Sequence, residues 1–204
     1  MNLNEDLVMR IVTYGGACSL DGFIADTNGG VEWLHMSRDV QAIMAEYWAT
    51  IDTLVWGRKT WDMAASMGGG DGGRQTMRNY VCSRTLTSVP GAELVSHDPG
   101  AFVLALKQQP GKGICVMSGG HLAQALFAAG AIDEVGLNIH PVLLGAGIPV
   151  VQNPGRPVSL ELREARTIGG GCVYVTYRVK TWRSNTSSRA RSGRGKSRAR
   201  RRSE

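Results

Sequence analysis

The chain has 204 residues, 43% of them hydrophobic, which is enough for one domain with a sizeable core or for two small ones. Its formal net charge of +6 comes from one end: residues 183–204 hold nine of the 23 Lys and Arg residues and one of the 17 Asp and Glu residues, so the remainder has 14 basic and 16 acidic residues. The high pI therefore describes the tail and says little about the body. No apolar run reaches the roughly 18 residues of a membrane-spanning helix, which argues against a membrane protein.

The amino-terminal end and the cysteines indicate a cytoplasmic protein. Residues 1–8 lack the basic and then apolar segments of a signal peptide, and we expect them to be a loose leader before Met9, a candidate for the true start. The four cysteines lie in or beside apolar, strand-like runs and form no C-x-x-C pair. Such cysteines are typical of reduced, buried thiols in a cytosolic protein.

The first half of the chain alternates strand and helix patterns. A run of β-branched and aromatic residues over 9–20 predicts a strand, and turn residues dominate 21–30. Ser37 is a favourable N-cap for a helix that ends near Ala49, because apolar residues recur there at helical spacing. The next predicted elements are a strand over 52–56, a helix over 59–67, a glycine-rich loop over 68–73 and a strand over 79–83.

The second half continues this alternation and ends in a hairpin. We predict strands over 93–96, 113–117 and 133–139, helices over 99–108 and 121–129, and an apolar loop over 141–151. Two alternating runs, 158–167 and 172–180, flank three consecutive glycines and predict a β-hairpin.

This order of elements predicts one α/β domain over residues 9–182. Its sheet should be mixed and mostly parallel, with helices on both faces and the β-hairpin at the carboxyl end. From residue 183 onward there is no large apolar residue, so 183–204 is expected to be a disordered, Arg- and Ser-rich basic tail.

Three strand-to-helix corners carry residues suited to phosphate groups. The first is formed by Gly57, Arg58, Lys59 and Thr60, the second by Ser83 and Arg84, and the third by Ser118, Gly119 and Gly120. Glycine allows close approach of the backbone, basic side chains supply positive charge, and a helix N-terminus attracts anions. Open α/β sheets bind ligands at the carboxyl ends of their strands, so we expect the three corners to form one site.

Each corner also has a structural explanation. The first fits an exposed basic turn, the second a solvated loop, and the third a tight turn that needs positive φ. Gly68, Gly70 and Gly73 match G-x-G-x-x-G but follow a predicted helix, so a Rossmann fingerprint is rejected. The histidines and cysteines lack metal-ligand spacing, so no metal site is predicted.

Several segments occur in the order seen in dihydrofolate reductase-like proteins: SLDGFIA (19–25), DTLVWGRKTW (52–61), YVCSRTL (80–86), VMSGGHLAQALFAAGAIDEVGL (116–137), HPVLLGAGIPV (140–150) and the closing hairpin. Over residues 9–180 the chain most resembles the C-terminal reductase domain of the bifunctional riboflavin-biosynthesis deaminase-reductase and its stand-alone bacterial relatives. The H-x-E and P-C-x-x-C signature of zinc deaminases is absent, so only the reductase half is expected.

The resemblance implies a dihydrofolate reductase-like fold and an NADPH-dependent reductase. Its substrate would be a small heterocyclic or carbonyl compound, such as 5-amino-6-(5-phosphoribosylamino)uracil or dihydrofolate. By position, the first corner would contact the phosphates and adenosine side of NADPH and the second its 2′-phosphate, while Ala17 and SLDGFIA would lie beside the nicotinamide. The pyrophosphate would be held by Ser118, Gly119, Gly120 and His121. A homodimer is also expected, with 141–151 lining the substrate site or the dimer interface, or forming a buried apolar crossover.

Two carboxylates are candidates for the proton donor. Trp33 followed by Asp39 resembles, with a one-residue offset, the Trp and acidic residue of dihydrofolate reductases, and such an acid can bind an amide edge and aid proton transfer. Asp21 is the alternative. Both also have structural explanations, since Asp39 suits the first turn of a helix and Asp21 suits a turn before Gly22.

Two other functions fit the sequence. The Arg-rich tail, residues 183–204, would give weak, salt-dependent contact with nucleic acid, because it has no aromatic residue for base stacking. A catalytically silent relative would bind the nucleotide without transferring hydride.

Overall fold

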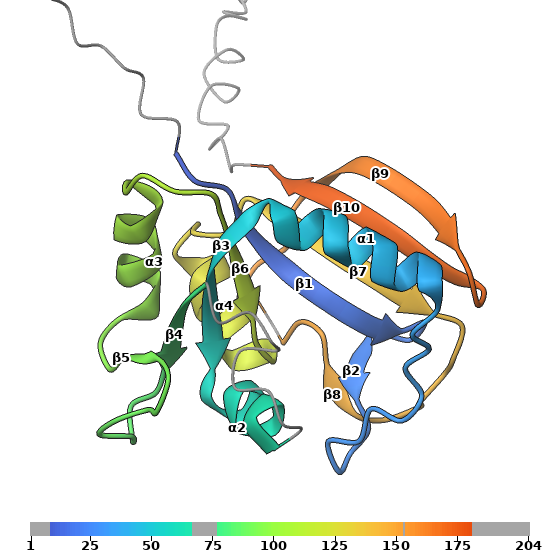
Figure 1. Ribbon diagram of the computed structural model, residues 1–204, viewed down its shortest axis with the longest axis horizontal. Helices are drawn as coiled ribbons and strands as arrows, with labels where there is room; N and C mark the ends of the chain where they lie inside the picture. Colours follow the sequence, from blue (N-terminus) through green and yellow to red (C-terminus); the bar gives the residue numbers. More distant parts are fainter. Residues whose placement is uncertain (1–8, 67–76, 153, 181–204) are drawn as a thin grey trace, which may run out of the picture.

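The computed structural model describes residues 9–66, 77–152 and 154–180. The expected leader 1–8, the glycine-rich loop 68–73 and the basic tail 183–204 lie outside the described residues, as does residue 67, the expected end of one helix. The described chain forms an eight-stranded sheet in the order β5-β4-β3-β6-β1-β7-β10-β9, flanked by four helices (Figure 1).

The strands and helices have the following bounds. The main sheet contains β1 (Val12–Ser19), β3 (Ile51–Gly57), β4 (Arg78–Cys82), β5 (Glu93–Val95), β6 (Gly113–Met117), β7 (Glu134–His140), β9 (Leu160–Ile168) and β10 (Cys172–Val179). A separate pair is formed by β2 (Phe23–Ala25) and β8 (Ile148–Pro149). The helices are α1 (Arg38–Ala49), α2 (Arg58–Ser66), α3 (Pro99–Lys107) and α4 (Gly120–Ala128).

The sheet is parallel from β5 to β7, and β10 and β9 continue it in antiparallel fashion. The turn between β9 and β10 contains Gly170 at φ +82° and Gly171 at φ +75°, a region that favours glycine. The predicted fold class is therefore confirmed, including its C-terminal hairpin.

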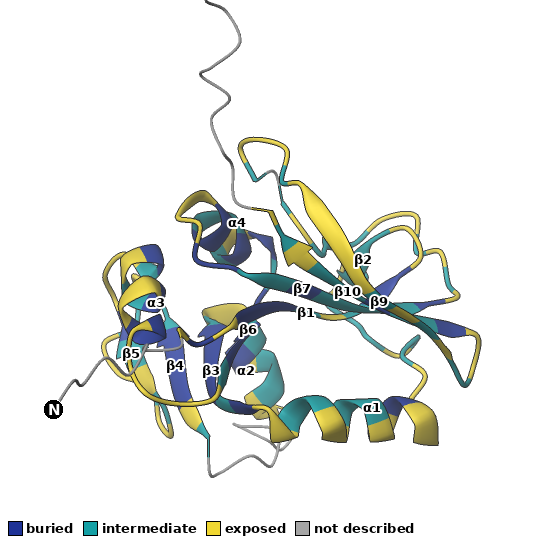
Figure 2. Cartoon of the chain, turned by 90° about the horizontal axis from the view of Figure 1, so that it is seen from above, coloured by how far each residue is buried: buried dark blue, intermediate teal, exposed yellow. Residues whose placement is uncertain are grey.

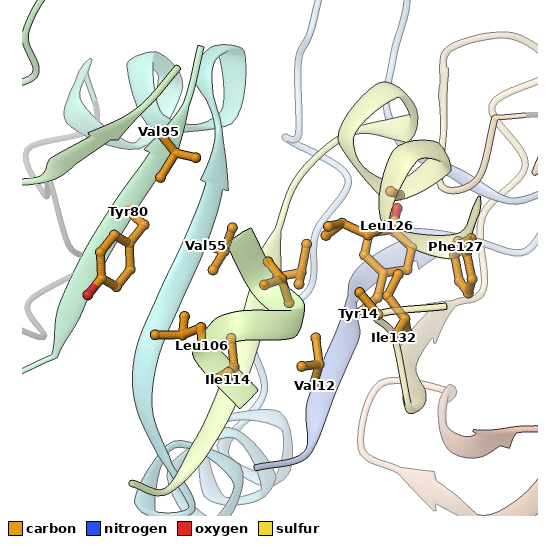
Figure 3. Packing of buried hydrophobic residues seen from close by; sticks show 14 of the residues in the cluster. Val12, Tyr14, Val55, Tyr80, Val95, Leu106, Ile114, Leu126, Phe127 and Ile132 are labelled. Carbon is orange, nitrogen blue, oxygen red and sulfur yellow. The ribbon is translucent and has the colours of Figure 1, made fainter. Parts of the chain in front are cut away.

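Two hydrophobic layers hold the helices on the sheet. The first lies beneath α3 and α4 and contains Val12, Tyr14 and Ile114 (Figure 3). The second lies beneath α1 and α2 and contains Leu54 and Trp56. Figure 2 shows the two helix pairs on opposite sides of the strands. Because side chains alternate along a strand, each central strand contributes to both layers, which explains its nearly continuous apolar sequence.

The ends of several elements differ from the predicted ones. β1 begins at Val12, and the buried side chain of Arg10, just before the strand, pairs with Asp52. Asp133 precedes β7, and its carboxylate accepts hydrogen bonds from the Val12 amide (2.9 Å) and from Nζ of Lys107 (2.7 Å). Each charged residue thus joins elements far apart in the sequence, which local patterns do not reveal.

The 141–151 segment, expected to be a loop, contains the short strand β8. It pairs with β2 in the registers Phe23↔Pro149 and Ala25↔Ile148. Neither strand exceeds three residues, so a period-two pattern is too short to detect.

The chain leaves β3 and β6 in opposite directions. These strands are neighbours, with Trp56 opposite Met117, yet β3 leads into α2 on one face and β6 into α4 on the other (Figure 2). In open α/β sheets, ligands bind where the chain diverges in this way at the carboxyl ends of adjacent parallel strands.

Candidate functional site

Gly57 and Ser118 bring the first and third predicted corners together. A β-carbon built on Gly57 would lie 3.2 Å from the β-carbon of Ser118, so the two strand ends touch. Gly57 is also opposite Cys82 in β4, which places Ser83 and Arg84 at the next position along the same edge. The structure therefore places the three corners side by side along the carboxyl edge of the sheet.

Ser118 has a hydroxyl group that the fold does not use. The residue is 8% exposed, and its Oγ has no hydrogen-bonding partner among the described residues. It directly precedes Gly119, the N-cap of α4, whose first turn receives no hydrogen bond from a capping side chain. A buried hydroxyl beside uncapped backbone N–H groups is suited to an anionic oxygen.

The two glycines of this corner differ in their surroundings. A β-carbon on Gly119 would meet its nearest neighbour, Cγ2 of Ile148, at 3.8 Å, so this position has room beside it. A β-carbon on Gly120 would lie 2.5 Å from the β-carbon of Gln152, so this glycine is required for packing. His121 is exposed on the first turn of α4.

β1 lies beside these strand ends and has an open backbone edge. Its pairing with β6 ends at Tyr14↔Val116, whereas its pairing with β7 continues to Ser19↔His140. Gly16 lies in this stretch and is exposed, and a β-carbon placed on it would have no heavy atom of the described residues within 4 Å. Ala17, predicted to lie beside the nicotinamide, follows it and is half-buried.

Gly16 was not among the predicted site residues. The signal that points to it is the Gly15-Gly16 pair inside an otherwise β-branched and aromatic strand. Gly15 has a separate role, because a side chain there would collide with the backbone carbonyl of Gly136 in β7.

The basic residues of the first two corners face solvent. Arg58 and Lys59 are exposed at the start of α2, and Arg58 forms an ion pair with Asp62 (Nε–Oδ2 3.1 Å). Arg84 is exposed as well. Ser83 is buried, and its Oγ accepts the backbone N–H of Leu86 at 3.2 Å, so this hydroxyl closes a turn.

Asp21 connects two loops. Its carboxylate accepts hydrogen bonds from the Ser19 hydroxyl (2.6 Å) and from the backbone N–H of Gly145 (2.8 Å). The Ser19 hydrogen bond, followed by those from Gly145 and Leu144, lowers the pKa of Asp21. Asp21 thus holds the 141–147 segment against the end of β1, and its role as a proton donor stays a prediction.

Asp39 lies in the first turn of α1, after the N-cap Ser37. Its Oδ2 accepts the backbone N–H of Gly169 at 3.0 Å, which ties α1 to the turn between β9 and β10. Trp33 packs edge-on against His140, with ring centroids 5.5 Å apart. The catalytic role predicted for Asp39 also stays a prediction.

Polar residues under α1 were missed by sequence analysis. Asn138 lies opposite Ala17 in the β1–β7 register, and the buried residue His140 follows two positions later on the same face of β7. The available signal was the polar alternation of Asn138 and His140 in an apolar strand. Burial, and next the nearby His35, lower the pKa of His140, so its imidazole is neutral at pH 7.

Two hollows lie at the other end of the sheet. They have volumes of about 420 and 450 Å³ and share Ile11 and Glu134 in their linings. None of the predicted site residues lines either hollow. We place the candidate site at the carboxyl ends of β3, β6 and β1, because helix N-termini and open glycines lie close together there.

The four cysteines all lie within the described residues, and none of them forms a disulfide. Cys18, Cys115 and Cys172 are buried and Cys82 is half-buried. Burial raises the pKa of Cys18 and of Cys82 to about 11, so both thiols are protonated at neutral pH.

Within residues 9–66, 77–152 and 154–180, no helix is long and apolar enough to cross a membrane. The same ranges contain no group of three His, Cys, Asp or Glu side chains placed to hold a metal ion.

The chain is similar to several known proteins. Residues 10–174 match the family described as the RibD C-terminal domain. The chain is 30% identical over 186 residues to the Bacillus subtilis (strain 168) protein YyaP, described as uncharacterized, and the match covers 86% of this chain and 98% of YyaP.

Solved structures show the same fold. A putative riboflavin biosynthesis protein from Shewanella sp. PV-4 is 27% identical, with a TM-score of 0.74 and coverage of 84% of this chain and 99% of that one. The deaminase/5-amino-6-(5-phosphoribosylamino)uracil reductase of Thermotoga maritima is 15% identical (TM-score 0.61; 84% of this chain, 57% of that one). Enterococcus faecalis dihydrofolate reductase, solved with NADP(H), is 16% identical (TM-score 0.57; 84% of this chain, 97% of that one).

Proposed function

This chain belongs to the RibD C-terminal domain family, and from that membership we propose that it is an NADPH-dependent reductase of a small heterocyclic or carbonyl substrate. The observation that carries the proposal is the buried hydroxyl of Ser118, which has no partner among the described residues and lies beside the uncapped N-terminus of α4. A pyrophosphate oxygen would satisfy both groups at once.

The residues along the carboxyl edge fit the other parts of NADPH. Ser118, Gly119 and the first N–H groups of α4 would hold the pyrophosphate, and Gly57, in contact with Ser118, would border the phosphates. Exposed Arg58 and Lys59 would lie near the phosphates and the adenosine side, and Arg84 would meet the 2′-phosphate. The nicotinamide would lie against the open edge of β1 at Gly16 and Ala17.

When bound, NADPH supplies the hydride, and the protein supplies binding, orientation and charge. The nicotinamide would lie next to the small residues of β1. Asp39 and Asp21 are the proposed carboxylates for proton delivery, although each already accepts a backbone N–H in this structure. A proton donor acting from either position would have to exchange that hydrogen bond for one to the substrate.

We propose 5-amino-6-(5-phosphoribosylamino)uracil as the first substrate to test, because a structural neighbour is named for its reduction. Dihydrofolate is the second, because another neighbour is a dihydrofolate reductase. Each compound would be incubated with the protein and NADPH, and the decrease in NADPH absorbance would show which of the two is reduced.

Ser118→Ala tests the nucleotide site. The Ser118 hydroxyl has no partner in the described structure, so its removal should leave the melting temperature nearly unchanged. The Kd for NADPH should rise by about tenfold, which corresponds to about 1.4 kcal/mol. Ser159→Ala, at an exposed position before β9, is the matched control. Unchanged NADPH affinity in Ser118→Ala, or no NADPH binding by the unaltered protein, would refute the proposal.

A homodimer is a further part of the proposal. Four exposed apolar side chains lie at the end of β1 and in the neighbouring 142–151 segment, namely Leu20, Leu143, Ile148 and Val151. Such a group of apolar residues is typical of an interface between subunits. Light scattering on the unaltered protein and on Leu143→Asp tests this, with a dimer expected for the first and a monomer for the second.

A further inference from the structure

The buried side-chain amide of Asn138 has a hydrogen-bonding partner among the described residues at only one of its two ends. One end of the amide lies 3.1 Å from Nε2 of His140. The other end is buried and meets no hydrogen-bonding group of the described residues. A buried polar group without a partner is unfavourable unless a ligand or a water molecule completes it.

The surroundings of His140 determine which end of the amide is unpaired. Nδ1 of His140 accepts the backbone N–H of His35 at 3.3 Å, so the neutral ring carries its proton on Nε2. That N–H is best accepted by the amide oxygen of Asn138, and the two ends of an amide exchange by a simple rotation. The NH₂ group of Asn138 then occupies the unpaired position and is a free donor.

A second donor belongs to the same cluster. The indole of Trp33 packs edge-on against the His140 ring, and its Nε1–H is buried without a partner among the described residues. The cluster around His140 therefore presents two N–H donors. Its chemistry favours a ligand with hydrogen-bond acceptors, such as the carbonyl oxygens of a heterocycle.

The position of Asn138 places this cluster beside the proposed nicotinamide. Asn138 is in register with Ala17, and parallel strands in register direct paired side chains to the same face. The neighbouring positions on that face are Gly15 and Gly136, which have no side chains and are half-buried. A planar ring could lie on this floor of small residues between α1 and the sheet.

This inference rests on the proposed function. We infer that Asn138 is a specificity-determining residue that donates a hydrogen bond to a carbonyl oxygen of the substrate, and that His140 is a positioning residue that holds the amide in the donating orientation. Both Asn138 and Trp33 are half-buried as whole residues, so the donors lie just beneath the surface.

The test uses the full chain with NADP⁺, which binds without allowing turnover, and 5-amino-6-(5-phosphoribosylamino)uracil as the probe. Asn138→Leu keeps the size of the side chain and removes both ends of the amide. Its affinity for the probe, measured by calorimetry, should fall at least tenfold, while its Kd for NADPH should stay within twofold of the unaltered protein. The side-chain NH₂ resonance of Asn138, assigned by its loss in Asn138→Leu, should shift when the probe saturates the unaltered protein.

Asn79→Leu is the matched control. The Asn79 amide has partners at both ends, since it accepts Nε1–H of Trp56 (2.9 Å) and donates to the carbonyl of Met77 (3.1 Å). Its loss should lower the melting temperature and leave probe affinity unchanged. The Trp56 indole resonance should likewise stay in place when the probe binds.

Three results would overturn the inference: equal probe affinity in Asn138→Leu, an Asn138 resonance that does not move at saturation, or no binding of the probe to the NADP⁺ complex. If a bound water molecule and not the probe shifted the Asn138 resonance, the shift would already appear with NADP⁺ alone, before the probe is added. If Asn138→Leu also loses NADPH binding, the resonance of the unaltered protein decides. Failure of the unaltered protein to bind NADPH would instead refute the proposed function.

Discussion

Gly57 and Ser118 touch across the carboxyl ends of β3 and β6, although 60 residues separate them in the chain. A β-carbon on Gly57 would lie 3.2 Å from that of Ser118. The contact joins two strand ends whose following helices lie on opposite faces of the sheet. The buried hydroxyl of Ser118 and the N-terminus of α4 lie together at this edge, where open α/β sheets bind ligands.

Replacement of Gly16 by Val should block the nucleotide without harming the fold. No heavy atom of the described residues lies within 4 Å of a β-carbon at Gly16, and a β-branched residue suits a strand. We expect stability within about 0.5 kcal/mol of the unaltered protein. The Kd for NADPH should rise at least tenfold because the side chain would occupy the place of the nicotinamide. Fluorescence titration measures the Kd and thermal melting measures the stability. Tight NADPH binding by the folded variant would contradict the placement of the nicotinamide at Gly16.

Arg84→Ala should weaken the binding of NADPH more than the binding of NADH. Arg84 is exposed beyond β4, at the edge where the 2′-phosphate is proposed to lie, and a guanidinium pairs well with a phosphate monoester. We expect about a tenfold loss for NADPH and less than a twofold loss for NADH, since one charge-assisted contact is worth about 1.5–3 kcal/mol before solvent screening. Arg163→Ala on β9 is the control. Equal losses for both nucleotides would mean that Arg84 does not contact the 2′-phosphate.

His140 should make the protein less stable as the pH falls below about 6.5. Burial holds the pKa of His140 below its ordinary value of 6.5, so the unfolded chain takes up the proton first. The contribution of neutral His140 to the free energy of unfolding is therefore fully present above pH 6.5 and decreases as the pH falls toward 5. Urea unfolding between pH 5 and 7.5 measures the effect. His140→Gln should flatten the profile, whereas His97→Gln, at an exposed position, should not.

Removal of residues 183–204 separates the proposed reductase from the nucleic-acid alternative. The removed segment carries nine Lys and Arg residues and one acid, while the site residues all precede it. A chain ending at residue 182 should keep its NADPH affinity and lose retention on DNA at low salt. Loss of NADPH binding on truncation would show that the tail contributes to the domain.

The succession of elements could be predicted from the sequence because it depends on local signals. Ser37 accepts the backbone N–H of Val40 at 3.2 Å, as expected of an N-cap, and Asp98 caps the helix that starts at Pro99. Alternating and continuous apolar runs are set by which faces of a strand are buried, so they identify the strands and the parallel sheet.

Contacts between distant segments could not be predicted in the same way. β2 and β8 pair across more than 120 residues, and Asp21 accepts the backbone N–H of Gly145 across a similar span. Asp39 bonds to Gly169 in the turn of a hairpin that lies far along the chain. Each of these residues has an ordinary local explanation, and only the fold shows which segment it meets.

The α/β class, the family resemblance and the three corners at strand ends depend on residue types at short spacing, so they could be predicted from the chain alone. The folded structure was needed to establish that Gly57 and Ser118 touch, that the Ser118 hydroxyl has no partner among the described residues, and that Gly120 packs against Gln152. It also decided that Gly16 is open and that Asn138 lies beside Ala17. These properties depend on strand order and register, which arise from long-range packing and leave no local pattern in the chain.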